Sequence, residues 1–236
     1  MDFNLKGGVL IIGSLYWQDH LTVEGDYIRK DWRNSRLDLE RFLDVNAPIK
    51  YGRFSKAGSY TMIFDGDLSA GQFGVGKFCP FKKDTTNWDD LHKEATLLSV
   101  AEGMNGDLIA GDYAWSVCGI LFNPKLEKKL KEEILEKWRE QLSQHVRGYK
   151  KLDSAPSSYS MNNKGEFDFP WPDGLNDYDF LIGTASKPKF RQGVTELTVD
   201  EISNHVPNRH YFLPNRKHSI TTYQDDEILE ILKGKQ

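Results

Sequence analysis

Short apolar runs separated by glycine and polar residues dominate the first half of the chain and predict strands there. The first run is residues 9–12, Val-Leu-Ile-Ile. Residues 49–54 and 60–65 flank an Ala-Gly turn signal, so we expect them to pair as antiparallel strands. Residues 71–80 contain glycines that suit a bulge or the bend of a curled sheet, and residues 114–122 are almost continuously apolar, as in a buried strand.

Apolar residues at helical spacing predict two long helices. One extends from a capping residue, Thr86, to near Gly103. The other covers residues 123–148, where Asn123 caps the helix and Pro124 fits its first turn. The apolar stripe of the second helix consists of Leu126, Leu130, Ile134, Trp138 and Leu142.

Residues 18–44 are charged and rich in turn residues. Four apolar side chains within them are spaced closely enough to the helical period to predict one amphipathic helix. These are Trp32, Leu39, Phe42 and Leu43.

The second half of the chain is less regular. Residues 151–177 shift to Ser, Pro, Asn, Gly and aromatic residues without a period, which predicts a long surface loop or lid. A strand is expected over 178–186, a short helix over 199–204, a short extended piece over 211–213 and a terminal helix over 226–232.

Together these elements predict an α+β protein with a curled, mostly antiparallel sheet or small mixed barrel, flanking helices and a C-terminal extension. The chain has 236 residues, 39% of them hydrophobic, which is enough for a full core. We expect residues 1–150 to form the barrel-like domain. Residues 151–236 would form a loop or lid and an extension that packs on it.

Composition narrows the function classes. The net charge is −4, with 31 Lys and Arg against 35 Asp and Glu, so no global positive field attracts nucleic acid. No run reaches the length of a membrane span and the N-terminus does not resemble a signal peptide, so a cytoplasmic protein is expected. Cys79 and Cys118 lie in apolar runs and are expected to be reduced core thiols. Neither they nor His205, His210 and His218 have metal-ligand spacing, so we expect no metal and no cofactor.

The candidate chemistry begins where the first strand ends. Residues 13–16, Gly13, Ser14, Leu15 and Tyr16, form a small-residue loop whose backbone N–H groups could hold a carboxylate or phosphate. About 90 residues later Glu102 precedes a helix-stopping glycine and could complete the same site. Arg53 is a further candidate, with Arg33 and Tyr51, because a guanidinium binds carboxylates in bidentate fashion.

A strand leading into Gly-Ser-Leu, an arginine-bearing segment, further strands and a helix that ends in Glu-Gly resemble the γ-glutamylcyclotransferase-like family. Gly13, Ser14 and Leu15 match its substrate-positioning loop, and Glu102 matches its acid/base catalyst. The chain has Ile12 where that family usually has tyrosine, and the likeness covers only the first half. The resemblance implies an enzyme that acts on a γ-glutamyl amine or amide and releases 5-oxoproline.

A different class of function fits the same residues. The 13–16 loop and the arginines could belong to a non-catalytic module that binds a small anion or nucleotide, and the aromatic segment 153–178 could close over it or dock a protein partner. Candidate contacts there are Phe167, Phe169, Trp171 and Tyr178. Glu102 could be a solvated helix-end carboxylate, in which case Glu94 is the alternative acid/base group. An enzyme requires Glu102 to point inward, beside the 13–16 loop.

Overall fold

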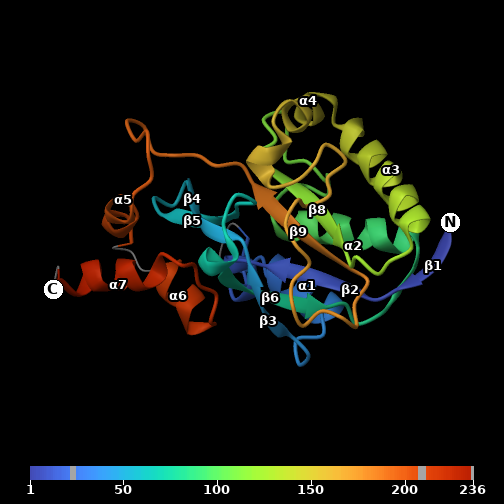
Figure 1. The fold of residues 1–236 in the computed structure, drawn as a ribbon, viewed down its shortest axis with the longest axis horizontal. Coiled ribbons are helices and arrows are strands. Elements are labelled where there is room, and N and C mark those ends of the chain that lie inside the picture. The colour runs from blue at the N-terminus through green and yellow to red at the C-terminus, as the bar shows by residue number, and fades with distance from the viewer. Residues whose placement is uncertain (22–24, 207–210, 235–236) are drawn as a thin grey trace.

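A five-stranded sheet forms the centre of the computed structural model, which describes residues 1–21, 25–206 and 211–234 (Figure 1). Its strand order is β3-β6-β2-β9-β8, in which β2 and β9 are parallel and the other neighbours are antiparallel. The strands are β2 (Gly7–Ile11), β3 (Leu43–Ala47), β6 (Gly74–Pro80), β8 (Ser116–Phe122) and β9 (Phe180–Ser186). The α+β class is confirmed, and among the described residues the sheet does not close into a barrel.

Two smaller antiparallel pairs accompany this sheet. β4 (Ile49–Phe54) pairs with β5 (Tyr60–Phe64), which confirms the predicted hairpin. In Figure 1 this hairpin lies between the central sheet and the C-terminal helices. β1 (Asp2–Leu5) pairs with β7 (Thr85–Asn87), an association that the sequence did not predict.

The helices α3 and α4 lie toward one end of the molecule and α5, α6 and α7 toward the other (Figure 1). The helices are α1 (Ile28–Arg36), α2 (Trp88–Ala101), α3 (Lys128–Gln144), α4 (Val146–Ser154), α5 (Val199–Asn204), α6 (Phe212–Lys217) and α7 (Asp225–Gly234). Short 3-10 turns cover Ser14–Tyr16, Ala70–Gln72 and Pro156–Tyr159. α2 packs on β8 and β9, and α5 packs on α7.

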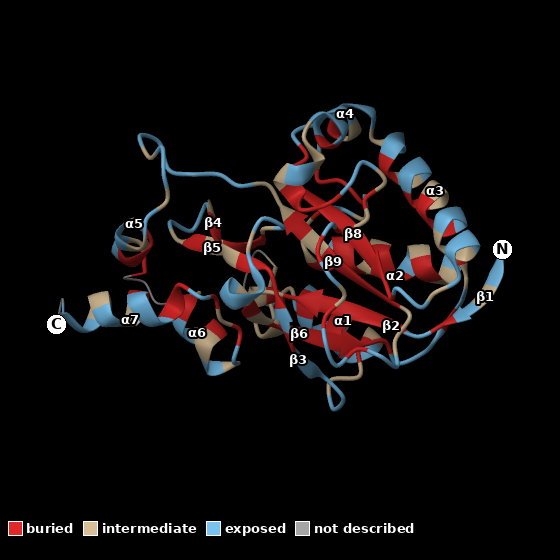
Figure 2. Cartoon of the chain, viewed as in Figure 1, coloured by how far each residue is buried: buried red, intermediate tan, exposed pale blue. Residues whose placement is uncertain are grey.

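The core surrounds the central sheet, and every residue of β2 and β8 is buried (Figure 2). α2 is buried through Leu91, Ala95 and Leu98, as its spacing predicts. The predicted stripe of α3 is confirmed in part: Ile134, Trp138 and Leu142 are fully buried, and Leu126 and Leu130 are partly buried. Cys79 and Cys118 are buried free thiols, which agrees with the expectation from the sequence.

The prediction of an amphipathic helix within 18–44 holds for α1 but is wrong for the residues that follow it. The chain leaves the helix at Leu37, which forms a bridge with Phe81, and the Asp38 N–H donates to the Pro80 carbonyl at 2.8 Å. Leu43 then starts β3. Pairing with the end of β6 therefore prevails over helical periodicity in this segment.

The expected helix caps are displaced as well. Asn123 does not cap α3, because its amide nitrogen donates to the Tyr178 carbonyl and its side-chain oxygen accepts from Lys125 N–H. α3 begins at Lys128 instead. The N-cap of α2 is Asn87, whose side chain accepts from the Asp90 N–H at 3.0 Å.

The segment 151–177 packs partly into the core. Of the four residues that the sequence offered as lid or partner contacts, Phe167 and Phe169 are buried and Trp171 and Tyr178 are partly buried. The Phe167 N–H donates to the Ile120 carbonyl, so this segment covers the free edge of β8. The ring of Phe167 lies over Gly119, and a Cβ at position 119 would lie 2.8 Å from the nearest atom of that ring. Aromatic residues that follow neither a helical nor a strand period therefore belong here to an irregular segment that packs on the sheet.

Residues beyond 150 also contribute to the sheet itself. β9, predicted as a strand, lies between β2 and β8, so the central sheet draws strands from both sides of the boundary expected at residue 150. The helices α5 and α7 agree with the sequence prediction. The extended piece expected over 211–213 is wrong, because Phe212 begins α6.

Candidate functional site

The predicted loop follows directly from β2. β2 pairs with the antiparallel strand β6 as far as Ile11. Ser14–Tyr16 then forms a 3-10 turn in which the Tyr16 N–H donates to the Gly13 carbonyl. Arg33 of α1 supports this turn from behind, because it donates to the carbonyls of Leu15 and Gln18 at 2.7 and 2.8 Å.

Glycine at position 13 is required by a close approach. The backbone there is extended, with φ of −174°, a conformation open to any residue. A Cβ at this position, however, would lie 2.3 Å from the hydroxyl oxygen of Tyr211. Burial raises the pKa of Tyr211 to about 12, so the hydroxyl stays protonated. Tyr211 thus brings the C-terminal part of the chain to the loop.

Glu102 lies at the C-terminal end of α2, where Gly103 takes a positive φ of 80° and ends the helix. Its side chain is 22% exposed. One carboxylate oxygen accepts a hydrogen bond from the hydroxyl of Thr184 on β9 at 2.9 Å, and the other lies 3.4 Å from Arg29. The carboxylate therefore points inward, as a site requires.

Arg29 joins Glu102 to the loop. This buried guanidinium donates to the Ala101 carbonyl at 3.0 Å, to Ser14 Oγ at 3.2 Å and to Gln18 Oε1 at 2.7 Å, besides its ion pair with Glu102. Sequence reasoning missed it as a site residue. It stands in a run of arginines, and no spacing in that run distinguishes the one that faces the cavity.

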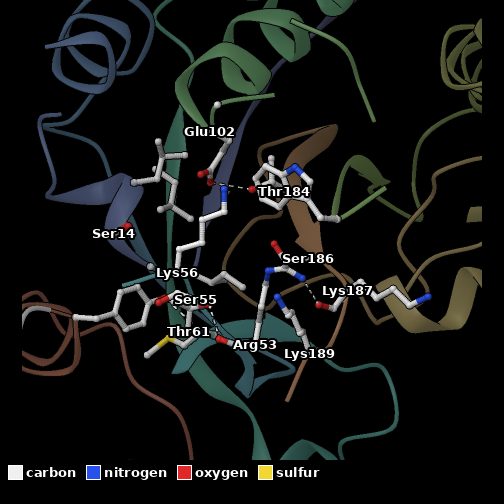
Figure 3. A pocket seen from close by; sticks show the side chains of 18 of the residues that line it. Ser14, Arg53, Ser55, Lys56, Thr61, Glu102, Thr184, Ser186, Lys187 and Lys189 are labelled. Atoms are coloured by element: carbon white, nitrogen blue, oxygen red, sulfur yellow. Dashed lines mark hydrogen bonds between the residues drawn. The ribbon is translucent and has the colours of Figure 1, made fainter. Parts of the chain in front are cut away.

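A cavity of about 1160 Å³ opens beside these groups. Its walls come from the 13–15 loop, the end of α2, the β4–β5 hairpin and the segment after β9. Five predicted site residues line it, and Figure 3 shows three of them, Ser14, Arg53 and Glu102, around the same space. The five are Gly13, Ser14, Leu15, Arg53 and Glu102.

Arg53 lies on β4, on the opposite side of the cavity from Glu102 (Figure 3). One guanidinium nitrogen donates to the Lys187 carbonyl at 2.8 Å, and the guanidinium lies 5.5 Å from the ring centre of Trp115. Burial lowers the pKa of Arg53 from its usual value, although the group remains cationic. Lys56 and Lys189 line the cavity as well.

Other candidates from the sequence lie elsewhere. Tyr16 is not among the residues that line the cavity; it packs against Phe42 and His218. Tyr51 is buried against Phe212. Glu94 forms an ion pair with Arg36, so the alternative acid/base group does not reach this site.

The comparisons supply no relative. Family models, curated proteins and solved structures were compared with the chain, and none matches it. Within the described residues no group of three His, Cys, Asp or Glu could hold a metal ion; His210 of the histidine cluster lies outside them. None of the described helices is both long and apolar enough to cross a bilayer.

The arrangement can support proton transfer. A partly exposed carboxylate faces a cavity large enough for a small molecule, and a cation and a hydroxyl fix its orientation. A carboxylate oxygen that accepts one hydrogen bond keeps a second lone pair for a ligand. Glu102 could therefore accept a proton from a bound amine without leaving its present position.

Proposed function

We propose that this protein is an enzyme of the γ-glutamylcyclotransferase type, which acts on a γ-glutamyl amine or amide and releases 5-oxoproline. The observation that supports the proposal is that one guanidinium, Arg29, contacts both Ser14 and Glu102. This reaction needs the acid/base carboxylate and the substrate-positioning loop within reach of one small molecule.

In the proposed reaction the α-amino nitrogen of the substrate attacks its own γ-carbonyl carbon. A five-membered lactam forms, and the bond between that carbon and the leaving amine breaks. Glu102 accepts, one after the other, the two protons that the α-ammonium loses as it becomes the lactam N–H, and passes each to the leaving nitrogen, which departs as an ammonium, so the carboxylate is regenerated. The N–H groups of residues 13–15 receive the α-carboxylate of the substrate, and Arg29 holds Glu102 in place.

The test measures 5-oxoproline released from a panel of γ-glutamyl dipeptides and γ-glutamyl amines. We expect Glu102→Gln to lower turnover by at least about a hundredfold, because the amide cannot relay the proton. Glu196→Gln is the matched control, since Glu196 is an exposed carboxylate between β9 and α5. Circular dichroism checks that both variants fold. Full turnover by Glu102→Gln would contradict the role of this residue.

A non-catalytic anion-binding module is the second candidate. It is favoured by the basic side chains that line the cavity, Arg53, Lys56 and Lys189, and by the fact that both carboxylate oxygens of Glu102 already have protein partners. This alternative expects no 5-oxoproline from any member of the panel, together with thermal stabilisation of the protein by small anions.

A further inference from the structure

The charges that line the cavity are unevenly distributed. Glu102 is the one carboxylate among the described residues that line the cavity, and Arg29 neutralises it. Four further cations line the cavity without an ion pair to any carboxylate in the described part of the chain: Arg53, Lys56, Lys187 and Lys189. This excess is local, because the chain as a whole carries a net charge of −4.

Arg53 is half-buried, whereas Lys56 and Lys189 are exposed. The one hydrogen bond of the Arg53 side chain to a described residue goes to the Lys187 carbonyl. A guanidinium has five N–H donors in a planar fork, so the remaining donors are available to a ligand. Burial already disfavours its charge, as the lowered pKa indicates. A bound anion would compensate this cost directly.

The backbone fixes Arg53 and Lys189 next to each other. The Phe54 N–H donates to the Lys189 carbonyl at 2.7 Å, and the Lys189 N–H donates to the Gly52 carbonyl at 3.0 Å. Two segments far apart in the sequence are thus joined on either side of Arg53. In Figure 3 Arg53 and Lys189 lie together opposite Glu102, whereas the side chain of Lys187 points away from them.

We infer that Arg53 and Lys189 form a subsite for a phosphate or dicarboxylate group on the part of the substrate distant from the γ-glutamyl bond. Two neighbouring cations match a doubly charged anion better than a single carboxylate. Lys56, whose side chain extends up the cavity in Figure 3, would lie along the linker between the two ends. The location of this anion on a leaving amine rests on the proposed function, but the anion subsite does not.

A matched series of γ-glutamyl compounds tests the inference. It comprises γ-glutamyl-ethylamine (neutral), γ-glutamyl-alanine (one carboxylate), γ-glutamyl-glutamate (two carboxylates) and γ-glutamyl-phosphoethanolamine (phosphate). We expect kcat/KM for a dianionic member to exceed that for the ethylamine compound by about tenfold to a hundredfold. Comparison of the glutamate and phosphate members distinguishes the two sources of the dianion.

Variants assign the effect to the subsite. Arg53→Gln and Lys189→Gln should each remove at least about tenfold of this preference through KM while sparing the ethylamine compound. Lys187→Gln is the matched control and should leave the preference unchanged. Lys189 is exposed, so its variant is informative even if Arg53→Gln folds poorly.

A binding arm separates the two proposals. Isothermal titration of the whole protein with phosphoethanolamine should show binding that weakens about tenfold in Arg53→Gln and Lys189→Gln. If this holds while no γ-glutamyl compound is turned over, the proposed reaction fails and the anion subsite stands. Turnover with equal kcat/KM across the series, unaffected by either variant, would refute the anion subsite and still support the proposed reaction. Neither turnover nor binding would overturn both.

Discussion

The two ends of the cavity differ in whether their charged side chains are paired. At one end Arg29 and Glu102 neutralise each other, and Ser14, Gln18 and Thr184 complete their hydrogen bonds. At the other end Arg53 and Lys189 face the cavity with no carboxylate partner among the described residues. A paired network holds its geometry before a ligand arrives, whereas an unpaired cation gains its partner from the ligand.

This difference indicates a division of work. The paired end is suited to position reacting atoms, since catalytic geometry must be held within a fraction of an ångström. The unpaired end is suited to recognition, since a charged group there forms its strong contacts only with the bound molecule. Both ends depend on β9 and the segment that follows it, which provide Thr184 and Lys189.

The largest expected effect is loss of the paired network. Arg29→Met removes hydrogen bonds to Ala101, Ser14 and Gln18 and leaves Glu102 without its cation. We expect the free energy of unfolding to fall by about 3 kcal/mol, the lower part of the range for a broken buried pair, because Glu102 is partly exposed. Urea denaturation measures it. A loss below about 1 kcal/mol would mean that this end is not held by its charges.

A smaller loss is expected where the loop meets Tyr211. Gly13→Ala places a methyl group 2.3 Å from the Tyr211 hydroxyl, at a cost of about 1–3 kcal/mol. Tyr211→Phe removes the nearest atom of this contact, so the double variant should recover part of the loss. A double-mutant cycle by urea denaturation measures the coupling. Simple additivity of the two losses would show that the contact does not constrain the loop.

The loop and Glu102 could be predicted from the sequence, but Tyr211 and Arg29 could not. A strand followed by small residues and a helix that ends at glycine are local signals, and the Gly13 and Glu102 that they indicate both line the cavity. Arg29 and Tyr211 reach the site through tertiary packing. The residues that flank them in the sequence give no signal of this packing, and the segment that contains Tyr211 was wrongly expected to be extended.

The fold shows the same limit. The hairpin of β4 and β5, the buried strands and the stripe of α3 follow from periodicity and turn residues. The packing of the segment 151–177 could not be predicted in this way, because the ring of Phe167 fills the space left by Gly119 on β8 and the aromatic residues of the segment have no period. The position of β9 beside β2 is likewise a long-range pairing that local pattern cannot specify.

The pH dependence of stability probes the paired end without disturbing its charges. Burial raises the pKa of Tyr211 to about 12, above its ordinary value near 10. Between these values the unfolded state loses this proton and the folded state keeps it, so stability falls as pH rises from about 10 to 12. Tyr211→Phe lacks this contribution and should show a decline smaller by about 1 kcal/mol near pH 11. Parallel urea titrations test this; identical alkaline slopes would contradict it.

The smallest effect on stability is expected at the unpaired end. Arg53→Met loses a hydrogen bond to Lys187 and contact with Trp115, but it also removes a partly buried charge that has no carboxylate partner among the described residues. Because these contributions oppose each other, we expect the free energy of unfolding to change by less than about 1 kcal/mol in either direction. Stabilisation by phosphoethanolamine, measured as a shift in Tm, should disappear in the same variant. A loss as large as that of Arg29→Met would mean that Arg53 supports the fold and that the two ends are alike. A small loss with the ligand response abolished would show that its charge serves binding.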